Sequence, residues 1–216
     1  MGNLGLNYKY QASDDNPFEI YGGDFDNNGI KDIVLGYYSD EELYPVRGLQ
    51  CSSEQIPDLK VKFPSYEKFG KSNLREIYGS ALEKALHYKA NHFSSSILWN
   101  EGDKFTVEPL PLQAQFFPIQ DCVFSDIDND QDLDIIIAGN WFVAEIETSR
   151  ADSGTGLILL NEGSRKFKPM SVVESGFFAK NDVRRMALLK GAKRPQIVVA
   201  NNNNALQFFE INQLSE

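Results

Sequence analysis

Residues 24 to 38 read DFDNNGIKDIVLGYY and join a polar loop to the start of an apolar segment. Oxygen-bearing side chains stand at relative positions 1, 3, 5 and 9, and they belong to Asp24, Asp26, Asn28 and Asp32. Gly29 occupies position 6, where a tight turn favours a residue without a Cβ atom. The apolar run that begins at Ile33 predicts a buried strand directly after the loop.

A second stretch further along the chain, SDIDNDQDLDIIIAGN, repeats this arrangement. An apolar run again follows the loop, and positions 1, 3, 5 and 9 are held by Asp126, Asp128, Asp130 and Asp134. Position 6 is Gln131 instead of glycine, and we expect this residue to strain the turn. Two loops of the same pattern before two apolar segments indicate an internal repeat.

Strand–turn–strand signatures recur as well, in SILWNEGDKF and LILLNEGSRKF, and each predicts a hairpin. The turn residues Asn100 and Asn161 are 61 residues apart, as are Asp121 and Asp182. The same offset predicts a third unit, whose strand contains Ile197, Val198 and Val199. Its loop positions carry no liganding side chain, because they fall on Ala187, Leu189, Gly191 and Pro195. We therefore expect the third unit to keep the architecture and to bind no ion.

Residues 39–90 depart from the strand pattern and predict a small helical insertion in the first repeat. In SNLREIYG, Ser72 is the expected N-cap of a short helix and Gly79 its C-terminal end. In SALEKALHYKA, Ser80 and Glu83 form a potential capping box, followed at helical spacing by Leu82, Ala85 and Leu86.

Together these patterns predict an all-β protein made of propeller-like blades. We expect one domain over 1–216 with about three repeats, in a partial or open propeller, and with the helical insertion at 39–90. A β-sandwich is the alternative, but it does not account for the 61-residue offset.

The chemistry of the two loops favours a hard cation. Carboxylate and amide oxygens at alternate positions converge when a loop curls tightly, and Ca²⁺ accepts about six to eight such ligands. An EF-hand would need a glutamate at position 12 and helices on both sides. Position 12 is Leu35 in the first loop and Ile137 in the second, so we reject an EF-hand. Solvated acidic turns without an ion are the remaining alternative.

DFDNNGIKDIVLG and DIDNDQDLDIIIAG resemble the calcium loops of FG-GAP repeats, also called VCBS-type repeats, which form the blades of integrin-α-like β-propellers. The resemblance implies two Ca²⁺ sites, with position 7 contributing a backbone carbonyl. The first site would contain Asp24, Asp26, Asn28, Ile30 and Asp32. The second would contain Asp126, Asp128, Asp130, Asp132 and Asp134.

Two further stretches, YPVRGLQCSSEQIP and SRADSGTGL, are similar to segments of large bacterial surface or secreted proteins with many such repeats. The chain resembles the C-terminal part of such a protein. Because propellers usually close with about four to eight blades, three units would leave strand edges exposed. Exposed edges favour self-association, so we expect a dimer or packed edges.

Composition excludes several other classes of protein. The net charge of −10 disfavours nucleic acid and anionic membranes as partners, and no apolar run reaches the ~20 residues of a membrane helix.

The first residues, MGNLGLNYKY, lack the pattern of a signal peptide, so we expect any export signal to belong to a longer natural chain. For Cys51 and Cys122 we expect two free, largely buried thiols, with a single disulfide as the alternative.

The sequence thus predicts a non-catalytic calcium-binding interaction or adhesion module of an exported protein, located outside the cell, in the periplasm or on the surface. Its ligand would be a protein or a polysaccharide. The alternative is a carbohydrate-active domain that binds or cleaves acidic polysaccharide, with carboxylates drawn from Glu41, Glu42, Glu145 and Glu147. A groove with clustered Arg, Lys, Tyr and His near one calcium would favour it. We expect no catalytic residues, because His87 and His92 lie on or just past the insertion helix and no nucleophile elbow is present.

Overall fold

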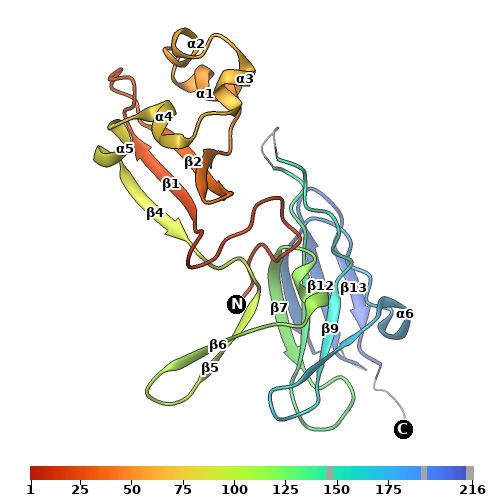
Figure 1. Cartoon of the computed structure of the whole chain (residues 1–216). Coiled ribbons are helices and arrows are strands. Elements are labelled where there is room, and N and C mark those ends of the chain that lie inside the picture. Colours follow the sequence, from red (N-terminus) through yellow and green to blue (C-terminus); the bar gives the residue numbers. More distant parts are fainter. Residues whose placement is uncertain (145–147, 191–193, 213–216) are drawn as a thin grey trace. The chain divides into compact units, whose positions relative to one another are not determined.

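The computed structural model of the chain describes residues 1–144, 148–190 and 194–212. Strands outnumber helices among these residues and form four antiparallel sheets, which confirms the all-β class (Figure 1). We expected one domain over 1–216, but the chain divides into two compact units. We call Lys9–Phe93 the insertion unit, and Met1–Tyr8 with Ser94–Glu216 the repeat unit.

The insertion unit is built on a four-stranded sheet in the order β3-β2-β1-β4. Its strands are β1 (Phe18–Gly23), β2 (Asp32–Ser39), β3 (Glu42–Pro45) and β4 (Leu86–Ala90). The first acidic loop joins β1 to β2, so the predicted strand after the loop is confirmed. Period-two alternation buries one face, where Tyr21 and Val34 pack against Leu74, and leaves Ile20 and Ile33 exposed on the other.

Five short helices lie between β3 and β4 in the sequence, and α1, α2 and α3 gather beyond one end of the sheet (Figure 1). They are α1 (Leu49–Gln55), α2 (Leu59–Lys62), α3 (Tyr66–Gly70), α4 (Leu74–Tyr78) and α5 (Ala81–Lys84). Their buried apolar side chains form a small core of their own, which includes Leu49, Ile56, Leu59, Phe63, Phe69 and Ile77.

Three details of the predicted insertion are wrong. Asn73, not Ser72, caps α4, because Asn73 and Glu76 form a reciprocal capping box. The Ser80 side chain makes no capping hydrogen bond, and α5 ends at Lys84. The segment after Ala85 is strand β4, because pairing with β1 supplies a ladder of hydrogen bonds that the local helical spacing does not outweigh. The prediction that Gly79 ends α4 is confirmed, with φ of 59°.

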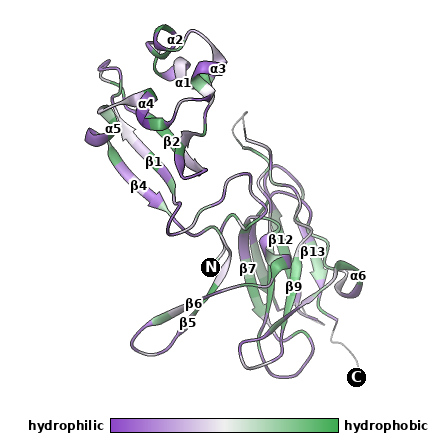
Figure 2. Cartoon of the chain, in the orientation of Figure 1, coloured by the Kyte–Doolittle hydropathy of each residue, from purple (hydrophilic) through white to green (hydrophobic). Residues whose placement is uncertain are grey.

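The repeat unit contains the other three sheets. Four strands have the order β10-β9-β8-β7, namely β7 (Ile119–Ser125), β8 (Asp134–Gly139), β9 (Leu157–Asn161) and β10 (Phe167–Met170). Three more pair as β11 (Val183–Leu189), β12 (Gln196–Asn201) and β13 (Gln207–Glu210). Between the sheets lies an apolar core that includes Val123, Ile136, Ile158, Val183 and Val199. In Figure 2 the strands of this unit are largely hydrophobic and the turns that connect them largely hydrophilic.

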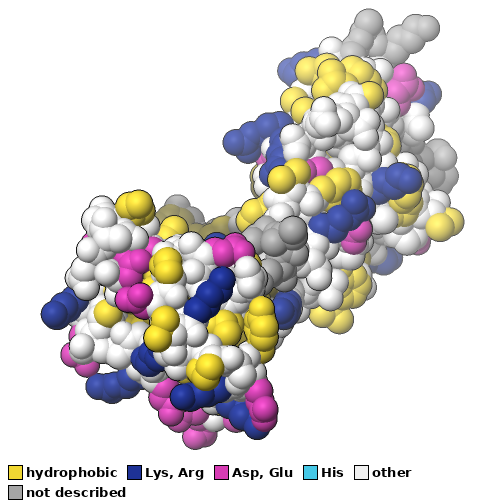
Figure 3. Space-filling view, turned by 90° about the horizontal axis from the view of Figure 1, so that it is seen from above, with side chains coloured by type: hydrophobic (Ala, Val, Ile, Leu, Met, Phe, Trp, Pro, Cys, Tyr) yellow, Lys and Arg dark blue, Asp and Glu magenta, His cyan; other side chains and the backbone are white. Residues whose placement is uncertain are grey.

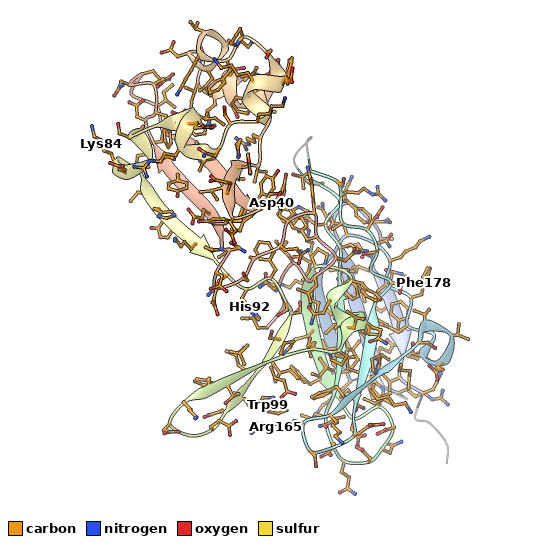
Figure 4. All side chains as sticks on the ribbon, viewed as in Figure 1. Asp40, Lys84, His92, Trp99, Arg165 and Phe178 are labelled. Carbon is orange, nitrogen blue, oxygen red and sulfur yellow. The ribbon has the colours of Figure 1, made fainter. Side chains whose placement is uncertain are left out.

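Both predicted hairpins are confirmed. One is β9–β10, and the other is β5 (Ser96–Asn100) with β6 (Phe105–Pro109). Trp99 attaches the second hairpin to the first, because its ring stacks with Phe167 at 6.4 Å and lies 4.9 Å from the Arg165 guanidinium (Figure 4). Arg165 also pairs with Glu101 at 2.8 Å. Two short helices, η1 (Leu112–Gln115) and α6 (Val172–Ser175), complete this unit among the described residues.

The third repeat keeps its strands but not its loop. The predicted strand Ile197–Val199 lies in β12, as expected. Ala187 and Leu189, which the offset placed in a loop, belong to β11 and pair with β12. Pro195 precedes β12, and Gly191 lies outside the described residues. Strand pairing therefore extends into the region that forms an acidic loop in the other two repeats.

Neither Cys51 nor Cys122, both among the described residues, forms a disulfide. Cys51 is half-buried, and Cys122 is exposed, which contradicts the prediction that both are largely buried. The reason is the alternation of β7, in which the neighbouring Val123 points into the core and Cys122 to the other face. No helix of the described residues is long and apolar enough to cross a membrane.

Candidate metal centres

The first acidic loop brings three carboxylates to one point. Asp24, Asp26 and Asp32 each offer an oxygen atom, and these three atoms lie within 4.8 Å of one another. The loop closes between Gly23 and Asp32, which face each other across the β1–β2 ladder. The predicted convergence of these three residues is therefore confirmed, in a geometry that could hold a metal ion.

Backbone N–H groups hold the side chains of this loop in place. Asp24 accepts hydrogen bonds from the N–H groups of Asn28 at 3.0 Å and Gly29 at 2.8 Å. The amide oxygen of Asn28 accepts one from Ile30 at 2.7 Å. Asn27 and Gly29 have φ values of 59° and 87°, so the chain turns twice through the left-handed region. These Asx-type turns point the alternate oxygens inward.

The second loop repeats this backbone path. Asp126, Asp128 and Asp130 offer oxygen atoms within 4.8 Å of one another. Asp126 accepts a hydrogen bond from the N–H of Gln131 at 3.1 Å, and Asn129 and Gln131 have φ values of 65° and 78°. Gln131 thus adopts the left-handed conformation that Gly29 adopts in the first loop.

Two oxygen atoms of the second loop lack a partner. In the part of the chain that the structure describes, one carboxylate oxygen of Asp126 and one of Asp128 are buried without a hydrogen-bond partner. Burying a carboxylate oxygen without compensation is costly, and two such oxygens beside a third carboxylate repel one another. A bound cation would satisfy both oxygens and reverse the repulsion.

The position-9 carboxylates, Asp32 and Asp134, are buried and bond backbone N–H groups of their own loops. Asp32 is 2 % exposed and accepts a hydrogen bond from the N–H of Phe25 at 2.9 Å. Asp134 is fully buried and accepts from the N–H groups of Ile127 at 2.7 Å and Asn161 at 2.8 Å. Burial raises the pKa of both carboxyls, these hydrogen bonds oppose the shift, and the neighbouring carboxylates add to it. Asp134, a predicted ligand, lies outside the convergent group and instead ties the second loop to the β9–β10 turn.

The elements on either side of the loops decide against an EF-hand. The first loop connects β1 to β2 and the second connects β7 to β8, so strands flank both of them. Each loop joins antiparallel neighbours of one sheet, and the predicted strand follows each of them.

The insertion unit contains a cavity of the kind that a carbohydrate-active domain would need. A cavity of about 550 Å³ is lined by residues that include Tyr21, Arg75 and His87, but Glu42 and Glu83 line it as well. Arg75 is paired with Glu83 at 3.2 Å, so the lining carries no excess of positive charge that would select an acidic ligand. Glu41 is exposed, and Glu145 and Glu147 lie outside the described residues. His87 is part of β4 and not of a helix.

Sequence reasoning missed the most heavily bonded carboxylate of this unit. Glu19 is 2 % exposed and contacts His87 at 2.9 Å and Lys89 at 3.3 Å. The available signal was the alternation of FEIYGG, which places Glu19 on the same face as the buried Tyr21. The sequence predicted a helix where β4 lies, and β4 carries His87 and Lys89, the two partners of Glu19.

No family model, curated protein or solved structure matches this chain. The resemblance of the loops to FG-GAP repeats therefore stays a prediction.

Proposed function

We propose that the chain is a non-catalytic calcium-binding interaction module of an exported, multi-repeat protein, with FG-GAP-type repeats arranged as an open propeller-like array. The unpartnered buried oxygens of Asp126 and Asp128 carry the proposal, because they are explained by a cation and not by a solvated turn. The first loop supports it, because it makes the same turn and also brings three carboxylates together, although its third is the position-9 Asp32 and not the residue at position 5.

The donor set favours calcium over other metals. All donors are oxygens, which suits Ca²⁺ and Mg²⁺ better than Zn²⁺, for which nitrogen and sulfur ligands are usual. Ca²⁺ tolerates irregular coordination, whereas Mg²⁺ demands a near-ideal octahedron and keeps several waters. Extracellular Ca²⁺ modules bind with dissociation constants of about 10⁻⁴–10⁻³ M, so such sites fill outside a cell and stay largely empty inside it. This argument supports an exported location.

The ion would act as a structural element. It would fix the turns between β1 and β2 and between β7 and β8, and thereby hold the surrounding loops in a defined shape for a protein or polysaccharide ligand. No step of chemistry is assigned to it.

The first test is thermal and urea unfolding in EGTA and then in a series of Ca²⁺ concentrations, with Mg²⁺ for comparison. At 100 times the dissociation constant, one site adds ~2.7 kcal/mol to the free energy of unfolding, and two independent sites add about twice that. Asp26→Ala and Asp128→Ala should each remove one increment, and the double variant should remove both.

Asp103→Ala is the matched control, because Asp103 is an exposed aspartate outside both loops. It should keep the full response to Ca²⁺. Equal stability with and without millimolar Ca²⁺ would refute the proposal.

A further inference from the structure

The residue directly after the first acidic loop is hydrogen-bonded to the helical insertion by one side chain. The Gln55 amide of α1 accepts a hydrogen bond from the N–H of Ile33 and donates one to its carbonyl, both at 3.1 Å. Ile33 directly follows Asp32, the last carboxylate of the loop. Gln55 thus bonds both backbone groups of one residue, as a neighbouring strand would.

Among the described residues, the second loop makes no side-chain hydrogen bond to a helix. Ile135 holds the position of Ile33 there, directly after Asp134, and pairs with Leu159 of strand β9. An ordinary sheet neighbour therefore supports the second loop, whereas a side chain of α1 substitutes for that neighbour in the first.

Apolar contacts add a second link. Phe25 stands between the two carboxylate residues Asp24 and Asp26, and its ring lies 5.4 Å from that of Tyr78 at the end of α4. Phe25 also packs against both the helical core and the buried face of the sheet. The side chain between these two carboxylate residues therefore packs directly against the helices.

A third link is the shared lining of one cavity. Asp26 borders a space of about 190 Å³ together with Asp58 and Lys62 of the insertion. Lys62 in turn donates hydrogen bonds to the carbonyls of Glu76 and Ile77, each at 2.7 Å. Asp26 of the first acidic loop thus lies beside the α2 segment, and Lys62 of that segment is hydrogen-bonded to the end of α4.

The helices depend on such contacts. The longest, α1, has seven residues, and isolated helices shorter than about 12 residues are not stable in water. Their order must come from their small core and from the loop and sheet against which they pack.

We propose that residues 24–32 and helices α1–α4 form one cooperative element, so that an ion bound in the first loop controls the order of the insertion. The proposal rests on the proposed function, which supplies the ion. By linkage, a partner that binds the ordered insertion would raise the affinity of the first loop for Ca²⁺ by the same factor. Helices α1–α4 are then the calcium-controlled part of the interaction module.

Hydrogen exchange followed by mass spectrometry on the whole chain, in EGTA and in saturating Ca²⁺, tests this directly. We expect Ca²⁺ to slow exchange in both loops and also in α1–α4, by about tenfold for a coupling of ordinary size. Asp26→Ala should abolish the effect in α1–α4, and Asp128→Ala, its counterpart in the second loop, should leave that effect intact.

Gln55→Met tests the link itself, because methionine keeps the length and helix propensity of glutamine and removes the amide. Gln50→Met is the matched control on the same helix, since Gln50 bonds Glu54 and Tyr66 and makes no contact with the loop among the described hydrogen bonds. Gln55→Met should reduce the Ca²⁺ effect in α1–α4 and preserve it in residues 24–32, whereas Gln50→Met should change neither.

The outcomes separate the two proposals. If Ca²⁺ protects neither loop, the proposed function fails. If Ca²⁺ protects the loops and leaves exchange in α1–α4 unchanged, the ion site stands and the coupling is wrong. Loss of protection in α1–α4 by Asp128→Ala would also overturn the coupling, because the effect would then not arise in the first loop.

Discussion

At the scale of the residue, position 6 of each acidic loop is the most informative site. Gly29 and Gln131 both have positive φ, and a Cβ atom at Gly29 would meet nothing within 4 Å. Space is therefore not what favours glycine in the first loop. A side chain is unfavourable there because the backbone is left-handed. Residues with a Cβ atom adopt that conformation at a free-energy cost of about 1 kcal/mol or more.

We expect Gln131→Gly to raise the free energy of unfolding by about 0.5–1 kcal/mol, because it relieves the left-handed strain and loses some of that gain to chain entropy. Gly29→Gln should lower it by a similar amount. Urea unfolding of both variants in EGTA measures the two effects without the contribution of an ion. Changes of the same sign in the two variants would contradict this account of position 6.

At the scale of the element, a single carboxylate connects three strands. Glu19 of β1 accepts hydrogen bonds from the Tyr38 hydroxyl of β2 at 3.3 Å and from Tyr21, and it pairs with His87 and Lys89 of β4. Burial alone would raise the pKa of Glu19, but the hydrogen bonds and the charge of Lys89 outweigh it and hold the pKa below its usual value. Burial and the bond to Glu19 in turn raise the pKa of Tyr21.

A lowered carboxyl pKa stabilises the fold above the pKa of the unfolded chain, and that stabilisation is lost as the pH falls through the folded pKa. Glu19→Gln should therefore cost about 2 kcal/mol at pH 7, the size of a hydrogen bond to a charged group. The difference in free energy of unfolding between variant and wild type should vanish on acidification. Glu19 takes up its proton only when the pH has fallen below 4.5, its usual pKa, because its pKa in the folded chain is lower. Urea unfolding between neutral and acidic pH measures this difference.

Glu41→Gln is the control for that experiment, because Glu41 is an exposed glutamate of the same unit. Glu41→Gln should leave the free energy of unfolding unchanged across the pH range. A cost of Glu19→Gln that stays constant down to the lowest pH would show that the Glu19 charge does not stabilise the sheet.

At the scale of the whole molecule, exposed apolar side chains favour self-association. All five residues of β6 are exposed, and Phe105, Val107 and their neighbour Leu98 on β5 are 65 %, 50 % and 44 % exposed. The register pairs Leu98 with Val107, so these side chains share a face of the hairpin. Hydrophobic side chains also lie between the charged ones on the surface in Figure 3. An exposed apolar edge strand is a template for another chain.

Sedimentation should therefore show association that increases with concentration, and Phe105→Lys with Val107→Lys should reduce it, because lysine blunts a strand edge. Val173→Lys is the control, since Val173 is a 96 % exposed apolar residue on α6 and not on a strand. A monomer over a wide concentration range, with no effect of the paired variant, would contradict the prediction.

Local sequence was sufficient where the determining interactions are themselves local. The 1-3-5-9 pattern predicted both acidic loops, because Asx turns form between residues two to five apart. The apolar runs predicted β2 and β8, and the strand–turn–strand signatures predicted both hairpins for the same reason. The strain expected at Gln131 follows from the chirality of its own backbone, and its positive φ agrees with it.

Tertiary structure decided what depends on partners far apart in the chain. Leu86–Ala90 became strand β4 because β1, more than sixty residues earlier, offered a ladder. Asp134 is hydrogen-bonded to Asn161, and Gln55 to Ile33. Glu19 pairs with His87 and Lys89. All of these contacts join residues far apart in the chain, so no local periodicity predicts them. The sequence by itself thus determined the two acidic loops and the all-β class, since short-range turns and short apolar runs specify them. Only the tertiary structure decided which carboxylates converge, which are buried as links, and which element supports each loop, because burial and long-range hydrogen bonds set those outcomes.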